Sequence, residues 1–418
     1  MSDRLTPEFA QSLDATDPMA TQREQFFLPK DVIYLDGNSL GVMPKGVESR
    51  IAKTISSEWG VDLIRSWNKA GWMDLPHTIG GKIGQMIGAE PNSVVVTDST
   101  SVNIFKALSA ALALNPGRRK IITERANFPT DNYIAEGIIK QMGNQHELIL
   151  IDDAADIVGA LDDNLAVLML THVNYRTGFM HDMAGLTKAV HDAGGLVLWD
   201  LAHSAGAVPV NLADANVDFA VGCGYKYLNG GPGAPAFIYA APRHQGGFQQ
   251  PLSGWFAHAA PFAFDPTYEP ARNISQYLCG TPPVLSMVAL DHSMDIWANI
   301  DMTALRAKSV ALTDYFIELV EARCMPLASE LSLITPRDAT LRGSQVSFTH
   351  PSAGYPMMSA LIAEGVIGDF RAPDIMRFGF TPLYLSFADL WHAVDIFADI
   401  LATGRWDKPE FHTRKKVT

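Results

Sequence analysis

One lysine and one aspartate, each placed just after an apolar run, carry groups that could do chemistry together. Asp200 directly follows the run Leu196–Trp199, and Lys226 comes shortly after the run Phe219–Gly222. Ligands of open α/β sheets sit outside the carboxyl ends of strands, so both side chains are expected to face one crevice. A lysine amine forms a Schiff base with an aldehyde, and a carboxylate keeps an aromatic ring nitrogen protonated. The pair predicts pyridoxal phosphate, bound covalently to Lys226 with Asp200 at its ring nitrogen.

Either residue alone has an ordinary structural explanation. A single lysine is most often exposed, and a single aspartate often caps a helix. The surroundings of Lys226 favour a functional interpretation, because Tyr225 precedes it and Gly230, Gly231 and Gly233 follow. Glycines allow the backbone to pass close to a ligand.

A candidate phosphate site lies earlier in the chain. The β-branched run Val94–Thr97 is followed by Asp98, by hydroxyl side chains at 99–101, and then by an apolar pattern of helical spacing over 102–114. The free N–H groups and the dipole of a helix N-terminus favour an anion. Simple capping by Ser99 or Ser101 explains the same residues, and both explanations can hold together. Phe128, in a loop after another predicted strand, could stack on a planar ring.

The elements that must position these residues alternate between short apolar runs and helical patterns. This alternation predicts a mostly parallel sheet flanked by helices on both faces. Beyond about residue 284 the pattern changes to long helices and then to strands at 331–334, 345–348 and 375–380, which predicts a smaller α+β domain. We predict a large cofactor-binding domain over 45–290 and a small domain built from 1–44 and 291–418.

Composition narrows the class of protein. The 418 residues are 47% hydrophobic and 18% charged, as in a soluble enzyme. The net charge of −13 argues against a nucleic-acid partner. There is no apolar run of about 18 residues and no signal-peptide pattern, so neither membrane spanning nor secretion is expected. Three cysteines without paired spacing indicate no zinc site and a cytoplasmic location; no bound metal is expected.

Eight motifs together resemble the kynureninase family, fold-type I pyridoxal-phosphate enzymes of the aminotransferase class V group. The resemblance extends over nearly the full length, and the set is specific although no single motif is. The motifs are YLDGNSLG at 34–41, IRSWN at 64–68, FPTD at 128–131, WDLAHSAG at 199–206, YKYLNGGPG at 225–233, PLSGWF at 251–256, CGT at 279–281 and MRFGFTPLY at 376–384.

The resemblance implies a role for each cofactor-side residue. Lys226 would hold the cofactor and move protons, Asp200 would pair with the ring nitrogen, and Tyr225 would relay a proton. Phe128 would stack on the ring. The remaining cofactor contacts would be Thr100, Ser101, Asp131, Thr171, His203, Trp255 and Thr281. Trp255 and Thr281 would come from the neighbouring subunit, which implies a homodimer with shared active sites.

The resemblance also implies a substrate and a reaction. Arg377 is the candidate for the substrate carboxylate, because a guanidinium binds a carboxylate at two points. An arginine on a surface strand is the ordinary alternative, although its apolar neighbours favour burial with a ligand. Ser39, Trp67 and Gly280 match other substrate-side positions. The implied reaction is hydrolysis of L-kynurenine to anthranilate and L-alanine in tryptophan catabolism, on the kynurenine pathway, with 3-hydroxykynurenine as a further possible substrate.

Two alternatives keep the same lysine and aspartate. A cysteine desulfurase, another class V enzyme, would need a reactive cysteine on a mobile loop. Cys223 lies in a predicted strand, Cys324 ends a helical stretch, and Cys279 lies in a loop matched to cofactor contact. A non-catalytic protein that binds the cofactor without turnover is the second alternative. The sequence leaves both open.

Overall fold

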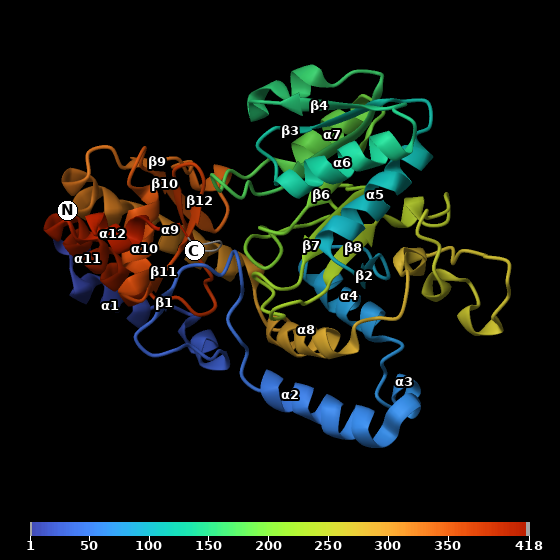
Figure 1. Ribbon diagram of the computed structural model, residues 1–418, viewed down its shortest axis with the longest axis horizontal. Coiled ribbons are helices and arrows are strands. Elements are labelled where there is room, and N and C mark those ends of the chain that lie inside the picture. The colour runs from blue at the N-terminus through green and yellow to red at the C-terminus, as the bar shows by residue number, and fades with distance from the viewer. Residues whose placement is uncertain (1, 415–418) are drawn as a thin grey trace.

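The computed structural model describes residues 2–414, which form a larger part around one mixed sheet and a smaller part beside it (Figure 1). The sheet of the larger part has seven strands in the order β2-β8-β7-β6-β5-β3-β4. β8 is antiparallel to both of its neighbours, and the other pairs are parallel. The strands are β2 (Val94–Val96), β3 (Lys120–Glu124), β4 (Glu147–Ile151), β5 (Leu165–Thr171), β6 (Leu196–Asp200), β7 (Phe219–Cys223) and β8 (Ala236–Ala240). The predicted mostly parallel sheet is confirmed.

Alternate side chains of the central strands enter two separate hydrophobic cores. Leu198 and Val221 face the core that is covered by helices α5 (Thr100–Leu114) and α6 (Pro129–Gln141). Val197 and Ala220 face the opposite core. That core is covered by α4 (Leu75–Met86), α7 (Met183–Asp192) and α8 (Val284–Trp297). Helices therefore lie on both faces of the sheet, and only the strand ends remain open to bind a ligand.

Strand β8 was not predicted from the sequence. Its five residues lie between Pro235 and Pro242 and include two alanines, which are depleted in strands. All five are buried on one face or the other, so there is no apolar–polar alternation to detect. The antiparallel β8 fills the gap between β2 and β7, and its first residue, Ala236, begins at the edge where the parallel strands end.

The smaller part holds a four-stranded antiparallel sheet in the order β12-β13-β10-β9. The strands are β9 (Ser332–Leu333), β10 (Gln345–Thr349), β12 (Asp369–Arg371) and β13 (Ile375–Gly379). The helices are α1 (Pro7–Ala15), α9 (Met302–Arg323), α10 (Gly354–Ala363), α11 (Phe387–Thr403) and α12 (Pro409–His412). A short parallel pair, β1 (Ile33–Tyr34) with β11 (Val366–Ile367), attaches the N-terminal segment to this part. The pairing places Asp369 of β12 opposite Arg377 of β13.

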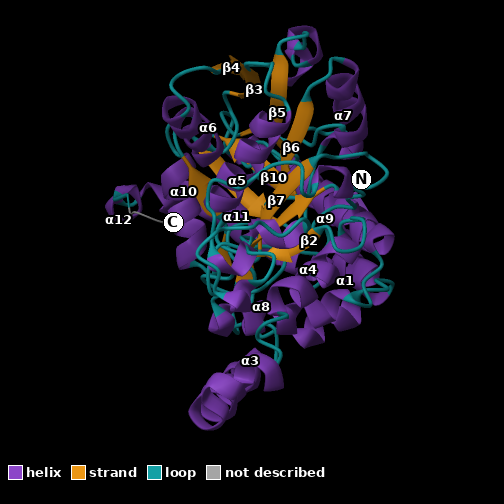
Figure 2. Cartoon of the chain, turned by 90° about the vertical axis from the view of Figure 1, so that its right-hand side faces the viewer, coloured by secondary structure: helices purple, strands orange, loops and turns teal. Residues whose placement is uncertain are grey.

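A helical arm projects from the body (Figures 1 and 2). It consists of α2 (Val47–Lys53), a π-helical stretch Thr54–Asp62 and α3 (Ser66–Lys69). Large apolar side chains are exposed on it, with Trp59 57% and Ile64 76% accessible. Patches of this kind mark interaction surfaces in soluble proteins. Within residues 2–414, no helix is both long and apolar enough to cross a bilayer.

Asp218, just before β7, fastens the two strands that carry the reactive pair. Its carboxylate accepts the amide of Val197 in β6 at 2.8 Å and contacts His191 at 2.8 Å and His244 at 2.7 Å. Arg243 donates to it at 2.7 Å. Burial alone would raise the pKa of Asp218, but the hydrogen bonds from His191, His244 and Val197 outweigh burial and hold the pKa well below its usual range.

Replacing Asp218 with asparagine is expected to lower the free energy of unfolding by about 3 kcal/mol near neutral pH, because it removes one member of a buried charge cluster. A lowered carboxyl pKa contributes stability above the unfolded value, and this contribution is lost as the pH falls below about 4. The loss should therefore shrink on acidification. Urea unfolding measures it, with the exposed Asp152→Asn as control. Equal stability of Asp218→Asn and the parent at neutral pH would contradict this account.

Candidate active site

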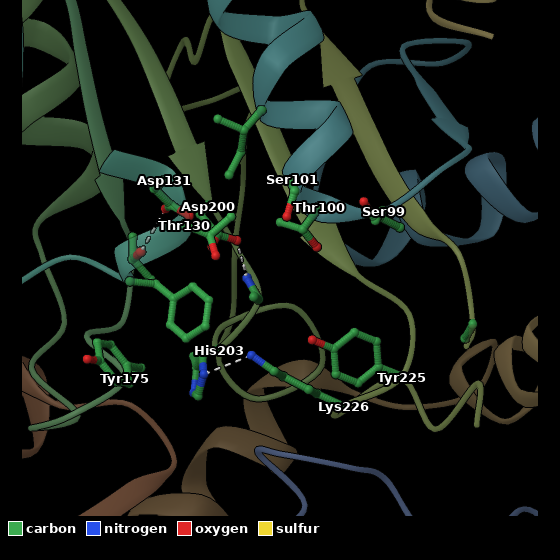
Figure 3. Close-up of a pocket in the computed structure, with 16 residues that line it drawn as sticks. Ser99, Thr100, Ser101, Thr130, Asp131, Tyr175, Asp200, His203, Tyr225 and Lys226 are labelled. Atoms are coloured by element: carbon green, nitrogen blue, oxygen red, sulfur yellow. Dashed lines mark hydrogen bonds between the residues drawn. The ribbon is translucent and has the colours of Figure 1, made fainter. Parts of the chain in front are cut away.

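The carboxyl ends of β2, β3, β5, β6 and β7 meet at one edge of the sheet and surround a cavity of about 660 Å³, open to solvent (Figure 3). Most of the predicted cofactor residues line it: Thr100, Ser101, Phe128, Asp131, Thr171, Asp200, His203, Tyr225 and Lys226. The topology thus brings together residues that are far apart in the chain.

Lys226 and Asp200 lie in the same cavity (Figure 3). Lys226 follows β7, and its Nζ is 3.0 Å from Nε2 of His203. Asp200 ends β6, is buried, and accepts the amide N–H of Ala202 at 2.8 Å. Burial raises the pKa of Asp200 to about 6, although the positive charge of Lys226 opposes the shift. The carboxylate is therefore costly to ionise without a cationic partner.

A second buried carboxyl group adds to this cost. Asp131 lies in the first turn of α6 and receives a 3.5 Å hydrogen bond from the Thr171 hydroxyl. Burial raises the pKa of Asp131 well above its usual value, and the charge of Asp200 raises it further. Two neighbouring buried carboxyl groups resist carrying two negative charges. A protonated ring nitrogen placed beside them would relieve this repulsion.

His203 is the uncharged neighbour of the lysine. Burial lowers its pKa well below the usual value, and the positive charges of Lys226 and Arg377 lower it further. A neutral imidazole can accept a hydrogen bond from an ammonium group at Nε2. His203 therefore orients the Lys226 side chain without competing for its charge.

The opposite end of the cavity offers hydroxyl groups at a helix N-terminus. Thr100 and Ser101 occupy the first turn of α5, and the Ser99 side chain caps the helix by accepting the amide of Val102 at 3.4 Å. Capping and an anion site therefore coexist, since one serine caps and the neighbouring hydroxyls line the cavity. Burial raises the pKa of Tyr225, so its phenol stays protonated and can donate a hydrogen bond.

The residues fit pyridoxal phosphate. A carboxylate for the ring nitrogen, an amine for the aldehyde and a hydroxyl-rich helix N-terminus for the phosphate surround a single cavity. The ring of Phe128, 43% exposed, lines the same cavity and can cover the ring of the cofactor. No cluster of metal-ligating residues occurs among residues 2–414.

Arg377 lies behind the cavity wall, in β13, with 2% of its surface exposed. Its Nε donates to Asp369 at 2.8 Å, and a second hydrogen bond joins its Nη2 to the same carboxylate. Its other donors reach the Ser39 hydroxyl at 2.7 Å and the main-chain carbonyl of Tyr175 at 2.9 Å. Tyr175 itself lines the cavity. Two of the predicted substrate-side residues, Arg377 and Ser39, are thus in direct contact, and Tyr175 lies between Arg377 and the cavity.

The other predicted residues lie outside this cavity. Trp255 is 40% exposed, and Gly280 and Thr281 are also exposed. Trp67 lies on the projecting arm, where its ring packs edge-on against Trp72 at 5.9 Å. Within residues 2–414, none of these four residues lines the cavity.

Two positioning residues were missed from the sequence. The ring of Tyr175 packs edge-on against the ring of Phe128, with 5.2 Å between the ring centroids, and its main-chain carbonyl accepts a hydrogen bond from Arg377. Its position a few residues past β5 was an available signal, since aromatic residues at strand ends often line ligand sites. Asp369 had no such signal, because the three-residue strand β12 that carries it was not predicted.

The cysteines show no sign of activation. Cys223 and Cys324 are buried, and burial raises the pKa of both thiols, that of Cys324 to about 12. A thiol is reactive as its thiolate, so these two groups are poor nucleophiles. Cys279 is partly exposed and does not line the cavity within the described chain.

The raised pKa of Asp200 predicts a pH dependence of stability. In the cofactor-free folded chain Asp200 keeps its proton to about pH 6, whereas the unfolded chain releases it near pH 4. The folded state binds more protons between these values, so its stability falls as the pH rises through this window. Asp200→Asn should show a shallower fall, measured by urea unfolding at each pH. Identical slopes for Asp200→Asn, the parent and an exposed control, Asp214→Asn, would refute the assignment.

Comparisons with known proteins agree with this site. A family model for the kynureninase C-terminal domain matches residues 305–397. A kynureninase from Burkholderia mallei (strain SAVP1) is 56% identical over 417 residues, covering 99% of this chain and 100% of that protein. A kynureninase from Pseudomonas fluorescens is 53% identical over 411 residues, covering 97% of this chain and 98% of that protein.

Solved structures of lower identity share the fold. A mutant of the cystine C-S lyase C-DES, with glycine covalently linked to its pyridoxal-phosphate cofactor, has a TM-score of 0.78 and 16% identity, covering 90% of this chain and 99% of that one. The Escherichia coli cysteine desulfurase CsdA has a TM-score of 0.76 and 19% identity, covering 93% and 98%. At these identities the likeness shows a fold-type I architecture alone. The two kynureninases are 53–56% identical to this chain over nearly its full length, against 16–19% for these solved structures. This chain belongs to the kynureninase family.

Proposed function

We propose that this protein hydrolyses L-kynurenine to anthranilate and L-alanine in tryptophan catabolism, with Lys226, Asp200 and Tyr225 as its catalytic residues. The observation that carries the proposal is the meeting of Lys226 and Asp200 in one cavity beside a helix N-terminus. Membership of the kynureninase family supports the choice of substrate. Activity on 3-hydroxykynurenine is a further possibility for the same site.

Bound pyridoxal phosphate supplies a conjugated ring that takes up the electrons released at the substrate Cα and so weakens the Cβ–Cγ bond. Asp200 holds the proton on the ring nitrogen, because a buried carboxylate gains most from a charged hydrogen-bond partner. Lys226 anchors the cofactor and, once released by the substrate, its free amine takes the proton from Cα. Its neighbour His203, 3.0 Å away, keeps the amine in place.

Tyr225 serves as the acid of the site. Its phenol stays protonated because burial raises its pKa, and the Tyr225 ring lies 5.8 Å from Nζ of Lys226. A protonated phenol next to the amine can give a proton to the Cβ carbon that leaves the γ-carbonyl. Water adds to that carbonyl as the Cβ–Cγ bond breaks, which yields anthranilate and alanine.

Arg377 and Ser39 bind the substrate α-carboxylate in this proposal. Asp369 holds the Nε–Nη2 edge of the guanidinium, so the Nη1–Nη2 edge remains for a second carboxylate. In the free chain the Tyr175 carbonyl and the Ser39 hydroxyl occupy that edge. A substrate carboxylate is the stronger acceptor for a guanidinium, and it can take the place of the Tyr175 carbonyl. Trp67 and Gly280 would contact the aromatic part of the substrate.

The active form would be a homodimer in which Trp255 and Thr281 reach the cofactor of the neighbouring subunit. The exposed aromatic and apolar surface supports this, since Trp255 is 40% and Trp59 57% accessible in one chain. A groove of about 870 Å³ between the arm and the start of α8 is lined by Trp59, Trp72, Pro282, Pro283 and Leu285 among others. A second copy would cover this groove.

Two further proposals concern the domain boundaries and the cellular location. We propose a large domain at 45–290 and a small domain at 1–44 with 291–418, supported by the separation of the seven-stranded sheet from the four-stranded sheet. A cytoplasmic location is supported by Cys223, Cys279 and Cys324, which all carry free thiols.

Incubation of the purified, cofactor-loaded protein with L-kynurenine tests the proposed reaction. Fluorescent anthranilate should appear in a one-to-one ratio with alanine. Sulfide from L-cysteine without anthranilate would instead favour a desulfurase. Bound cofactor without turnover of either amino acid would favour a non-catalytic binding protein.

Replacement of Lys226 by alanine should abolish the covalent cofactor absorbance and lower kcat by roughly 10⁴-fold, at the upper end of what one acid–base group contributes. The reason is that the variant loses both the anchor and the base. Lys188→Ala, at a side chain that is 75% exposed, is the matched control and should behave as the parent. An unchanged absorbance spectrum in Lys226→Ala would contradict the assignment.

Arg377→Lys should raise the KM for L-kynurenine by about 10- to 100-fold with a smaller effect on kcat, because one charge-assisted hydrogen bond is lost while the positive charge beside Asp369 remains. Steady-state kinetics measure the two constants separately. Arg125→Lys, at an arginine side chain that is 59% exposed, controls for the substitution itself. An unaltered KM in Arg377→Lys would rule out carboxylate binding at this residue.

A further inference from the structure

A buried lysine that faces away from the cavity connects the cofactor helix to two outer loops. Lys106 lies on α5, about two turns after Thr100 and Ser101, and is fully buried. Its ammonium donates to the carboxylate of Asp98, which precedes α5, and to the main-chain carbonyl of Tyr277. Lysine is almost never fully buried unless it is paired, and Asp98 is the partner that allows the burial of Lys106.

The backbone of Lys106 holds the second loop. Its carbonyl accepts the side-chain amide of Gln250 at 2.8 Å, and Gln250 is itself 1% exposed. One residue therefore fastens Tyr277 through its side chain and Gln250 through its main chain. Both contacts are buried and shielded from water, where hydrogen bonds to charged groups are strong.

The two fastened loops carry the residues that lie outside their own subunit's cavity. Gln250 leads to Trp255, and Tyr277 leads to Gly280 and Thr281. The loops also pack on each other, because a Cβ added at Gly254 would fall 1.8 Å from the carbonyl oxygen of Cys279. Together they form one outer unit, defined here as residues 250–256 and 277–281, which is hydrogen-bonded to Lys106 of α5.

We propose that Lys106 is a positioning residue that acts across the dimer. It holds the outer unit of its own subunit in the geometry that completes the cofactor site of the neighbouring subunit. The carboxylate of Asp98 is the counter-charge that offsets the cost of burying the ammonium group. This inference rests on the proposed homodimer with shared sites and adds a residue that touches neither cofactor nor substrate.

The cross-subunit role predicts that each active site needs Lys106 in the neighbouring chain, so a dimer without Lys106 in either chain should be impaired at both sites. We expect the Lys106→Met homodimer to lose roughly 100-fold in kcat/KM, the loss that a displacement of about 1 Å at a reacting site produces. When the variant is first dialysed and then treated with borohydride, less cofactor should become fixed to it than to the parent. This readout does not depend on turnover. Gln249→Met, at the exposed neighbour of Gln250, is the matched control and should behave as the parent.

Mixed dimers assembled from differently tagged chains decide the question. In a dimer of Lys106→Met with Lys226→Ala, the only complete lysine site lies in the Lys106→Met chain and receives an intact outer unit from its partner. About half of the parental activity and one fixed cofactor per dimer should return. In a dimer of the parent with a chain carrying both substitutions, the only lysine site receives the damaged outer unit, and its activity per site should be as low as in the Lys106→Met homodimer.

Gln250→Met repeats the design without removing a buried charge, so it decides the matter if Lys106→Met fails to fold. The opposite pattern in the two mixed dimers would show that Lys106 acts within its own subunit and would overturn the inference while leaving the dimer intact. Parental activity and cofactor retention in both homodimeric variants would also overturn it. A chain that is monomeric by light scattering and fully active would remove both the proposed dimer and this inference.

Discussion

The structure depends on the charge balance between two buried carboxyl groups, Asp200 and Asp131, and the lysine that shares their cavity. Asp200 and Asp131 both resist ionisation because they are buried, and the ammonium of Lys226 is the nearby positive charge that offsets them. A buried carboxylate without a cationic partner costs several kcal/mol. A further cationic group beside these carboxyl groups would lower the cost of ionising them, and in our proposal the protonated ring nitrogen of the cofactor is that group.

The strand order of the large sheet brings these charged residues together. β6 and β7 are neighbours and parallel, so Asp200 and Lys226 reach the same edge although a long segment separates them. Asp218 ties the start of β7 to β6 through the Val197 amide, which fixes the relative height of the two strands. Helices cover both faces of the sheet, so the cavity lies at the strand ends. On the far side of the cavity wall, Asp369 neutralises Arg377 and aims its free edge toward the Tyr175 carbonyl.

The sequence allowed the large sheet and the cavity residues to be predicted because their signals are local. A buried parallel strand appears as an apolar run, and the residues at its carboxyl end must lie at the sheet edge, which located Asp200, Lys226 and the hydroxyl residues 99–101. Thr171 was expected from the family resemblance alone. Strand β12 escaped detection because it has only three residues, and strand β8 because its two alanines and its neighbouring prolines are not typical of a strand. Asp369 was missed with β12, because its importance comes from its partner across the sheet rather than from its neighbours in the chain. The contacts of Lys106 with Tyr277 and Gln250 span 171 and 144 residues and leave no trace in local patterning.

The central claim is that one lysine at the end of β7 carries the cofactor. Reduction of the loaded protein with borohydride, followed by digestion and mass measurement of the peptides, locates the bound group directly. The account predicts a single pyridoxyl label, on the peptide that contains Lys226. A label on any other lysine, with Lys226 unmodified, would contradict it.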